Sequence, residues 1–456
     1  MIKQLPVEFA ARMQEQLQTQ YGDYIDAISQ PPPISVRVNP KKITSPLPLE
    51  GVAWCTDGYY LPTRPVFTFD PLFQAGAYYV QEAGSMFIGW AMQHLSFEHE
   101  DLKVLDLCAA PGGKSTQLLS SINPQSLLVT NEVIKTRVSV LKENIEKWGY
   151  PNAAVTHNDP KDFETLESFF DVVVVDAPCS GEGLFRKDPN AIKEWSENNV
   201  QLCSQRQQRI LVSAQKTLKR GGYMLYSTCT HAPQENEENV RWIIENFGFE
   251  EVKIPLPQNS GIEESEFGYR FYPHKTKAEG FYCAILRKTE GKDINPQRPR
   301  RNAYNQEKKA SNQLLPFFDP EYDLVAYQKQ ENLYVLPYKH YEPLNILAER
   351  LRIVSVGTET GVFIKEDLIP AQGLAHSVAL KSGMFEPLEL DPHEALKFLR
   401  KDPINDPSGV MGWKMATYKG QGLGFLKNLG NRTNNYFPKE RRILKQPNQD
   451  ELFCLM

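Results

Sequence analysis

Short apolar runs alternate with stretches of helical periodicity between residues 76 and about 290. The runs read KVLDLCA, SLLVTNE, AAVTHND, DVVVVDAP and GGYMLYSTCT. This alternation is typical of parallel βαβ units. DVVVVDAP is apolar without interruption as far as Asp176, which indicates a central strand that is buried on both faces. We therefore predict a doubly wound, Rossmann-like α/β domain over residues 76–290.

Two further patterns complete this central domain. KTRVSVLKENIEKWG has helical spacing and ends at Gly149, a residue type that commonly ends a helix in the left-handed conformation. QENEENVRWIIENFG predicts another helix after the fifth strand. FEEVKI and GFYCAILRK follow, and we expect them to close the sheet as an antiparallel pair.

The flanking regions differ from the centre. Residues 1–75 begin with a helical pattern that the proline run 31–33 ends, and the alternating segment ISVRVNP predicts a strand, so we expect a small α+β domain. Residues 291–313 are polar and basic and predict a linker. Residues 314–456 contain short strand patterns (NLYVLP, RIVSVGTETGVFI) and one helical pattern (DPHEALKFLRK), which indicates a mixed α/β region.

Composition excludes several classes of protein. The 456 residues are 41% hydrophobic and 23% charged, which is ordinary for a globular chain and excludes a fibrous or wholly disordered one. The net charge of −5 excludes a basic nucleic-acid coat. The seven cysteines are scattered and form no C-x-x-C pair, which argues against a disulfide framework and a structural metal site. Without a signal peptide or an apolar run of about 18 residues, we expect a cytoplasmic protein that does not bind a membrane.

Polar groups and thiols gather at the predicted carboxyl ends of the strands, where ligands of such sheets bind. The groups are Asp106 to Ser115, Glu132, Asp159, Asp176 to Gly181, and Thr228 to Thr230. Each has a simpler interpretation alone, because an aspartate after a strand often caps a helix and a single cysteine is often a small buried residue. Their convergence favours a binding site over a set of caps around an empty crevice.

The segment from Cys108 to Ser115 allows two interpretations. It reads C-x-x-x-x-G-K-S, which matches a phosphate-binding loop except at its first glycine, and Cys108 lacks the conformational freedom that this position requires. We therefore favour another ligand over the nucleotide of a nucleotidase. Small residues leave room beside the backbone, Glu132 can accept both hydroxyls of a ribose, and Asp159 can reach an adenine amino group. A carboxylate-lined site without a pyrophosphate loop fits S-adenosylmethionine, which is cationic.

Cys179 and Cys229 follow the fourth and fifth strands, which are neighbours in the usual strand order. A thiolate that adds to carbon 6 of cytosine makes carbon 5 nucleophilic enough to accept a methyl group. Asp176 is placed to hold or protonate ring nitrogen 3, and a second thiol could assist release. The alternatives are that Cys179 only packs a turn and that His231 is a loop residue. We favour the loop interpretation for His231.

The segments DLCAAPGGKS, DAPCSGEG and STCT, in this order and spacing, resemble the Sun/Nop family of RNA cytosine-C5 methyltransferases. The resemblance extends over residues 30–290 and includes QEAGSMF and ISVRVNP. It implies an N-terminal RNA-binding domain before the methyltransferase core, with Cys229 as nucleophile and Cys179 as the cysteine that assists release. It also implies contacts with S-adenosylmethionine from Cys108, Ala109, Ala110, Pro111, Gly112, Gly113, Lys114, Glu132, Arg137, Asp159 and Asp176.

Residues 411–446 carry eight basic residues against one acidic residue, Glu440. The basic residues are Lys414, Lys419, Lys427, Arg432, Lys439, Arg441, Arg442 and Lys445. The aromatic residues between them are Trp413, Tyr418, Phe425, Tyr436 and Phe437. The charge excess favours contact with RNA phosphates, whereas the aromatics alone favour a small core.

The segment also resembles the PUA-like RNA-binding module of bacterial small-subunit rRNA enzymes of the same family. Together the patterns predict an RNA cytosine-C5 methyltransferase that acts on 16S rRNA, free or in the 30S subunit, as a monomer without a metal. A tRNA substrate and a non-catalytic RNA-binding factor in ribosome assembly are the alternatives.

Overall fold

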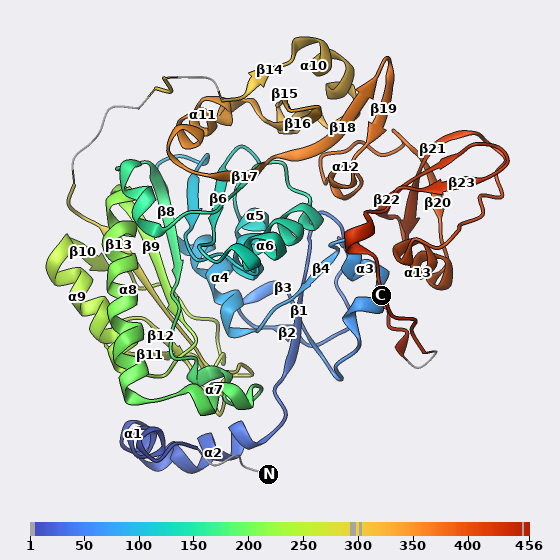
Figure 1. Ribbon diagram of the computed structural model, residues 1–456. Helices are drawn as coiled ribbons and strands as arrows, with labels where there is room; N and C mark the ends of the chain where they lie inside the picture. The colour runs from blue at the N-terminus through green and yellow to red at the C-terminus, as the bar shows by residue number, and fades with distance from the viewer. Residues whose placement is uncertain (1–4, 292–297, 301–302, 449–450) are drawn as a thin grey trace.

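The computed structural model describes residues 5–291, 298–300, 303–448 and 451–456 (Figure 1). Strands β5 (Lys103–Asp106), β6 (Leu127–Asn131), β7 (Ala153–Thr156), β8 (Phe170–Asp176) and β9 (Leu218–Thr228) lie parallel in the order β7-β6-β5-β8-β9. They form the centre of a ten-stranded sheet. The predicted Rossmann-like fold is therefore confirmed, with β8 buried as far as Asp176.

Alternate residues of the central strands lie in two hydrophobic cores, one on each face of the sheet. Val104 and Val172 pack with residues of α5 (Gly113–Ser121) and α6 (Lys135–Trp148), together with α4 (Phe87–His94). The intervening Leu105 and Val173 pack with α8 (Glu197–Thr217), α9 (Glu237–Phe247) and α11 (Tyr341–Arg350). Because both faces are covered, the strands consist of nearly continuous apolar residues, as the sequence indicated.

The sheet is extended on both sides. As predicted, β10 (Phe249–Glu251) and β13 (Phe281–Lys288) pair antiparallel, and β13 also pairs antiparallel with β9. β12 (Tyr269–Phe271) and β11 (Glu263–Glu264) continue this edge. At the opposite edge, β17 (Ile353–Val356) from the C-terminal region pairs antiparallel with β7. The C-terminal region is thus built into the central sheet.

The predicted end of α6 at Gly149 is confirmed. Gly149 has a φ of +88°, and a Cβ atom on it would lie 1.9 Å from the carbonyl oxygen of His376. Only glycine fits this close approach. The carbonyl of Gly149 accepts a bond from Val378 N (3.0 Å), so the helix end also anchors the segment after α12 (Gln372–His376).

The N-terminal elements belong to two different cores. Helices α1 (Val7–Leu17) and α2 (Tyr21–Ser29) lie beside α7 (Pro189–Glu194), away from strands β1 (Ile34–Val38), β2 (Gly51–Val52), β3 (Cys55–Leu61) and β4 (Tyr78–Val80) (Figure 1). Phe9 of α1 packs with Trp195, whereas Val36 of β1 packs in a core with Phe398. The predicted N-terminal combination of helices and strands is therefore confirmed, and the apolar faces of its helices and of its strands have separate partners.

Two sheets and several helices form the C-terminal region. One sheet has the order β14-β15-β16-β18-β19 and the other the order β20-β21-β22-β23. Their strands are β14 (Asn305–Gln306), β15 (Leu324–Lys329), β16 (Asn332–Pro337), β18 (Thr358–Ile364), β19 (Asp367–Pro370), β20 (Glu386–Glu389), β21 (Gly412–Tyr418), β22 (Gln421–Asn428) and β23 (Thr433–Asn435). The further helices of this region are α10 (Lys308–Leu314) and α13 (Pro392–Arg400), whereas α3 (Pro71–Gln74) lies in the N-terminal region.

The predicted linker is shorter than residues 291–313. Its last part forms β14 and α10, and Ala310 and Leu314 of α10 are buried. The polar composition concealed this short amphipathic helix, and residues 292–297 and 301–302 of the predicted linker lie outside the described residues. In the described part of the chain, none of the helices has the length and apolar character needed to cross a membrane.

Candidate active site

A cavity of about 830 Å³ opens at the carboxyl ends of the central strands. Its wall contains most of the predicted site residues, from segments that are far apart in the sequence. These are Cys108, Ala110, Glu132, Arg137, Asp159, Asp176, Cys179 and Cys229. Of the described residues, the other five candidates lie outside its lining, namely Ala109, Pro111, Gly112, Gly113 and Lys114.

The two predicted thiols are in contact. The Sγ atoms of Cys179 and Cys229 are 3.2 Å apart, and the backbone N of Cys229 lies 3.4 Å from the sulfur of Cys179. The hydrogen bond with Cys229, together with burial, raises the pKa of the Cys179 thiol well above its ordinary value. Cys179 therefore keeps its proton at neutral pH and can donate it toward the sulfur of Cys229.

A buried carboxylate joins the loops that carry the two thiols. Glu235 accepts hydrogen bonds from the backbone N of Ser180 (2.9 Å) and from the side chain of Gln207 (3.0 Å), and it contacts the hydroxyl of Ser180. That hydroxyl lies 2.9 Å from the hydroxyl of Thr230. Burial raises the pKa of Glu235 to about 7. Glu235 was not among the predicted site residues, because an acidic residue at a helix start normally indicates only a cap.

Asp176 is held by two neighbours at the end of β8. Lys114 Nζ lies 2.8 Å from Asp176 Oδ2, and the hydroxyl of Ser227 donates to Oδ1 at 2.8 Å. Burial alone would lower the pKa of Lys114, but the neighbouring carboxylate of Asp176 outweighs burial and raises it. In a phosphate-binding loop the lysine and serine would contact phosphates. Here Lys114 pairs with Asp176, and the hydroxyl of Ser115 donates to Asp106 (2.6 Å).

Glu132 and Asp159 project from the ends of β6 and β7. Glu132 accepts a hydrogen bond from the backbone N of Ile134 (2.8 Å), and its Oε2 atom lies 3.2 Å from Arg137. Asp159 accepts a bond from the backbone N of Lys161 (2.9 Å) and so caps the turn that begins at Pro160. Both also line the cavity, so the capping role and the binding role of Asp159 are compatible.

Three cations at the cavity, apart from the predicted Arg137, were not predicted. Arg206 and Arg209 of α8 are exposed and line it, as does Lys161. In the described part of the chain, neither arginine takes part in an ion pair, whereas Lys216 on the same helix pairs with Glu164 (2.6 Å). Their spacing of three residues places both on one face of a helix, and this signal could have identified them.

The basic C-terminal segment is only partly available to a ligand. Lys414 is buried beside Asp406 (3.3 Å), and Arg441 forms a bidentate pair with Glu146 of α6 (2.7 and 3.0 Å). These two residues of the predicted RNA-binding surface therefore have a structural role, because their charges are already paired within the protein. Tyr418, Phe425 and Phe437 are buried in cores. Tyr436 is exposed and packs edge-to-face on Trp413, and Lys427 lies over the Trp413 ring.

Comparison with known families matches three parts of the chain. Residues 92–287 match the model of the family "16S rRNA methyltransferase RsmB/F". Residues 5–83 match "N-terminal domain of 16S rRNA methyltransferase RsmF", and residues 385–443 match "Methyltransferase RsmF PUA domain".

Similar proteins cover nearly the whole chain. The chain is 31% identical to ribosomal RNA small subunit methyltransferase F of Vibrio cholerae, over 96% of this chain and 97% of that protein. It is 29% identical to the protein of that name in Shewanella loihica, over 92% and 91% of the two chains. Among solved structures, a methyltransferase homolog protein from Pyrococcus horikoshii is 26% identical, with a TM-score of 0.53 over 62% of this chain and 94% of that chain.

The buried carboxyl of Asp106 predicts a pH dependence of stability. Burial raises its pKa to about 7, whereas an aspartate in the unfolded chain titrates near 3.9. Between about pH 4 and 7 the folded state therefore binds the extra proton, and the free energy of unfolding rises as the pH falls, by up to about 1.4 kcal/mol per pH unit from this group. Asp106→Asn should lose this contribution and be more stable than wild type above pH 7.

Urea unfolding at pH 5.5, 6.5 and 7.5 measures the effect as the difference between the two proteins. Glu235 is present in both, so its own titration cancels in that difference. Parallel curves for wild type and Asp106→Asn would contradict the assignment.

Proposed function

The chain belongs to the ribosomal RNA small subunit methyltransferase F family of 16S rRNA methyltransferases, and from this premise we propose that it transfers a methyl group from S-adenosylmethionine to carbon 5 of a cytosine in 16S rRNA. One observation carries the proposal. The thiols of Cys179 and Cys229 lie 3.2 Å apart in the wall of a cavity that carboxylates also line. Covalent activation of a pyrimidine ring requires a thiol nucleophile at such a site.

The residues at the cavity fit the methyl donor. Glu132 would accept the ribose hydroxyls in place of its present contact with Arg137, and Asp159 would accept the adenine amino group. Leu107, Ile134 and Ile210 supply apolar wall for the adenine ring. The carboxylates favour the positive charges of the donor. When bound, S-adenosylmethionine supplies a methyl group that is activated by its sulfonium.

Cys229 is the proposed nucleophile. Its thiolate adds to carbon 6 of the cytosine and forms the sulfur–carbon bond, and the electrons of the carbon 5–carbon 6 double bond make carbon 5 the nucleophile that accepts the methyl group. Asp176, whose Oδ2 atom is paired with Lys114, is proposed to hold the edge of the ring at nitrogen 3. The base must leave the RNA stack to present its ring face to the thiol.

Cys179 is proposed to assist release. A base, for which solvent water is available at the open cavity, takes the proton from carbon 5; the electrons of that carbon–hydrogen bond restore the double bond, and the bond between carbon 6 and sulfur breaks with its electrons on the sulfur of Cys229. The leaving thiolate forms 3.2 Å from the Cys179 thiol, whose raised pKa keeps it protonated, so that it can stabilise the thiolate by donating a hydrogen bond. The two cysteines thus have different tasks because their environments differ.

Two substitutions separate these tasks. Cys229→Ala should abolish methylation and leave donor binding within about 2-fold of wild type, because the nucleophile is absent. Cys179→Ala should retain adduct formation and slow release, so that a covalent protein–RNA species accumulates on a denaturing gel.

Cys203→Ala is the matched control, since this buried thiol lies on α8 and hydrogen-bonds to Asn199. It should turn over normally. Methylation by Cys229→Ala would refute the assignment of the nucleophile, and normal turnover by Cys179→Ala without an adduct would reduce Cys179 to a packing residue.

Arg206 and Arg209 are proposed to contact the phosphates beside the extruded cytosine, because both line the cavity that holds the thiols and neither forms an ion pair with another described residue. The Arg206→Gln/Arg209→Gln double variant should weaken RNA binding and reduce the slope of log K against log salt concentration by about 1.4, or about 0.7 per lost phosphate contact. Fluorescence anisotropy with a labelled 16S rRNA fragment measures the slope.

Lys216→Gln serves as control, because its charge lies on the same helix and is already paired with Glu164. Its slope should equal that of wild type. An unchanged slope in the double variant would show that the two arginines face solvent only.

A further inference from the structure

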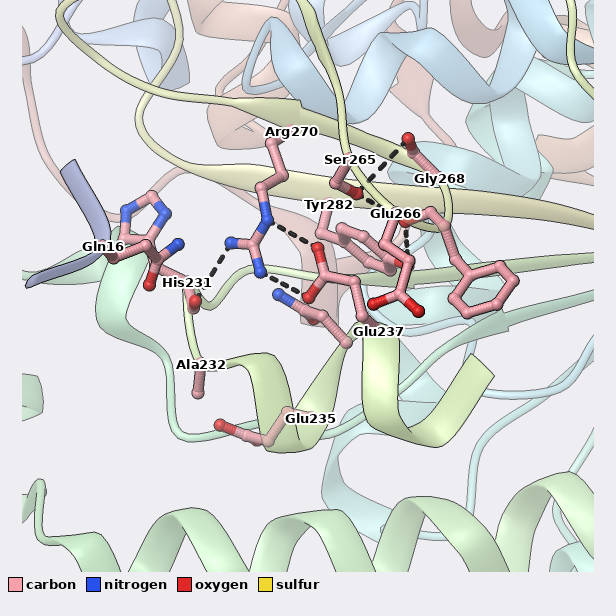
Figure 2. Close-up of polar contacts among 12 residues, drawn as sticks. Gln16, His231, Ala232, Glu235, Glu237, Ser265, Glu266, Gly268, Arg270 and Tyr282 are labelled. Atoms are coloured by element: carbon pink, nitrogen blue, oxygen red, sulfur yellow. Dashed lines mark hydrogen bonds and ion pairs between the residues drawn. The ribbon is translucent and has the colours of Figure 1, made fainter. Parts of the chain in front are cut away.

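The peptide groups of His231 are held by buried charges on both sides. The backbone N of His231 donates to Glu182 Oε2 at 3.0 Å. Its carbonyl oxygen accepts a bond from Arg270 NH1 at 3.0 Å, a contact that Figure 2 shows. Side chains of this charge are seldom fully buried unless they are paired, yet Glu182 is 1% exposed and Arg270 7% exposed.

Each of these two charged side chains forms an ion pair with a residue from another part of the chain. Glu237, at the start of α9, receives both Arg270 Nε (2.6 Å) and Arg270 NH2 (2.5 Å) in a bidentate pair (Figure 2). Glu182 pairs with NH2 of Arg12 from helix α1 (2.7 Å) and accepts a bond from the indole of Trp195 (2.8 Å). The fixed fork of a guanidinium suits such directional bonding.

The imidazole of His231 does no acid–base work in this arrangement. It stacks on Tyr272 at 5.3 Å between ring centroids and lies edge-on to Tyr24 of α2. Burial, with the nearby charges of Arg270 and Arg12, lowers its pKa to about 3. The ring is therefore uncharged at neutral pH and packs between aromatic side chains. This environment is consistent with the expectation that His231 is not the activating base.

The anchored peptide lies two residues from Cys229. The carbonyl oxygen of Cys229 accepts a bond from the backbone N of Gly183 (2.9 Å), the residue after Glu182. A Cβ atom on Gly183 would lie 3.0 Å from that oxygen and 2.5 Å from the carbonyl oxygen of Gly280, so the segments are in close contact. The pair Glu182–Gly183 thus fixes the main chain at both Cys229 and His231.

We propose that Glu182 and Arg270 are positioning residues that fix the Cys229 thiol for attack, and that helix α1 takes part in this task through Arg12. The inference rests on the proposed role of Cys229 and extends it, because it makes the reactivity of the thiol depend on an N-terminal helix and on β12. Neither residue lines the cavity. Both act through the main chain of the segment from Cys229 to Ala232.

Substitution of a positioning residue should lower the rate of methylation and leave the binding of donor and RNA unchanged. A misplacement of about 1 Å at the reacting atoms can cost about 100-fold in rate. Donor and RNA affinities depend on other residues of the cavity and on the basic surface, so they should stay within about 2-fold. A residue with a purely structural role would instead lower the fraction of folded protein and leave the turnover of each folded molecule unchanged.

Arg270→Lys tests this prediction with the charge retained. A lysine can pair with Glu237, but it lacks the fork that bonds Glu237 and the His231 carbonyl together. We expect a folded protein with kcat reduced about 100-fold and KM for RNA unchanged. Arg241→Gln is the matched control, since Arg241 forms an exposed pair with Glu266. It should retain full activity, and equal kcat in Arg270→Lys and wild type would overturn the proposal.

Arg12→Gln provides a second variant if changes at Arg270 prevent folding. Its side chain is partly exposed, so the substitution is milder, and we expect kcat to fall about tenfold. A change confined to KM would overturn the proposal.

A third measurement requires no substrate. It is the rate at which iodoacetamide alkylates Cys229, which mass spectrometry can follow. An altered rate in Arg270→Lys with intact donor binding supports positioning even if cytosine proves not to be the substrate. An unaltered rate refutes positioning even if the methyltransferase activity is confirmed.

Discussion

The parallel pairing of β8 with β9 is the constraint on which the site depends. Its register places Asp176 beside Ser227, so that the loops that follow bring Cys179 and Cys229 into contact although 50 residues separate them. Alternate residues of β8 pack in different cores, Val172 in one and Val173 in the other, so a slip by one residue would disturb the close packing on both faces of the sheet. Glu235 and Ser180 then tie the two loops together. The contact between the two thiols therefore depends both on the packing of the sheet and on a buried polar network between the loops.

The regions outside the central sheet are integrated with it. Helices α1 and α2 pack on the segment around Phe185, Trp195 and Ala232, next to Cys229, and β1 shares a core with the C-terminal residues Phe398 and Tyr418. The bidentate pair between Arg441 and Glu146 joins the C-terminal region to α6, and β17 completes the edge of the central sheet. RNA that binds to the N-terminal or C-terminal elements would therefore contact a body continuous with the active site.

The sequence predicted the central fold and most of the cavity because both depend on local patterns. The apolar run before Asp176, Gly149 after α6 and the carboxylates after four of the five strands have direct structural consequences. Contacts between segments that are distant in the sequence could not be predicted from these local patterns. Nothing near Arg12, Glu182 or Arg270 indicates that these residues meet around His231, and the edge strand β17 has the same alternation as a local hairpin. Lys414 and Arg441 count as basic surface by composition, although burial and pairing with acids make them structural.

We propose above that the chain methylates carbon 5 of a cytosine in 16S rRNA. Bisulfite sequencing of total RNA from cells with and without the gene tests it most directly, because 5-methylcytosine resists conversion. The account predicts one or more protected cytosines in 16S rRNA that lose protection when the gene is deleted and regain it with the wild-type gene but not with the Cys229→Ala gene. Unchanged protection throughout 16S rRNA, or a loss confined to tRNA, would contradict it.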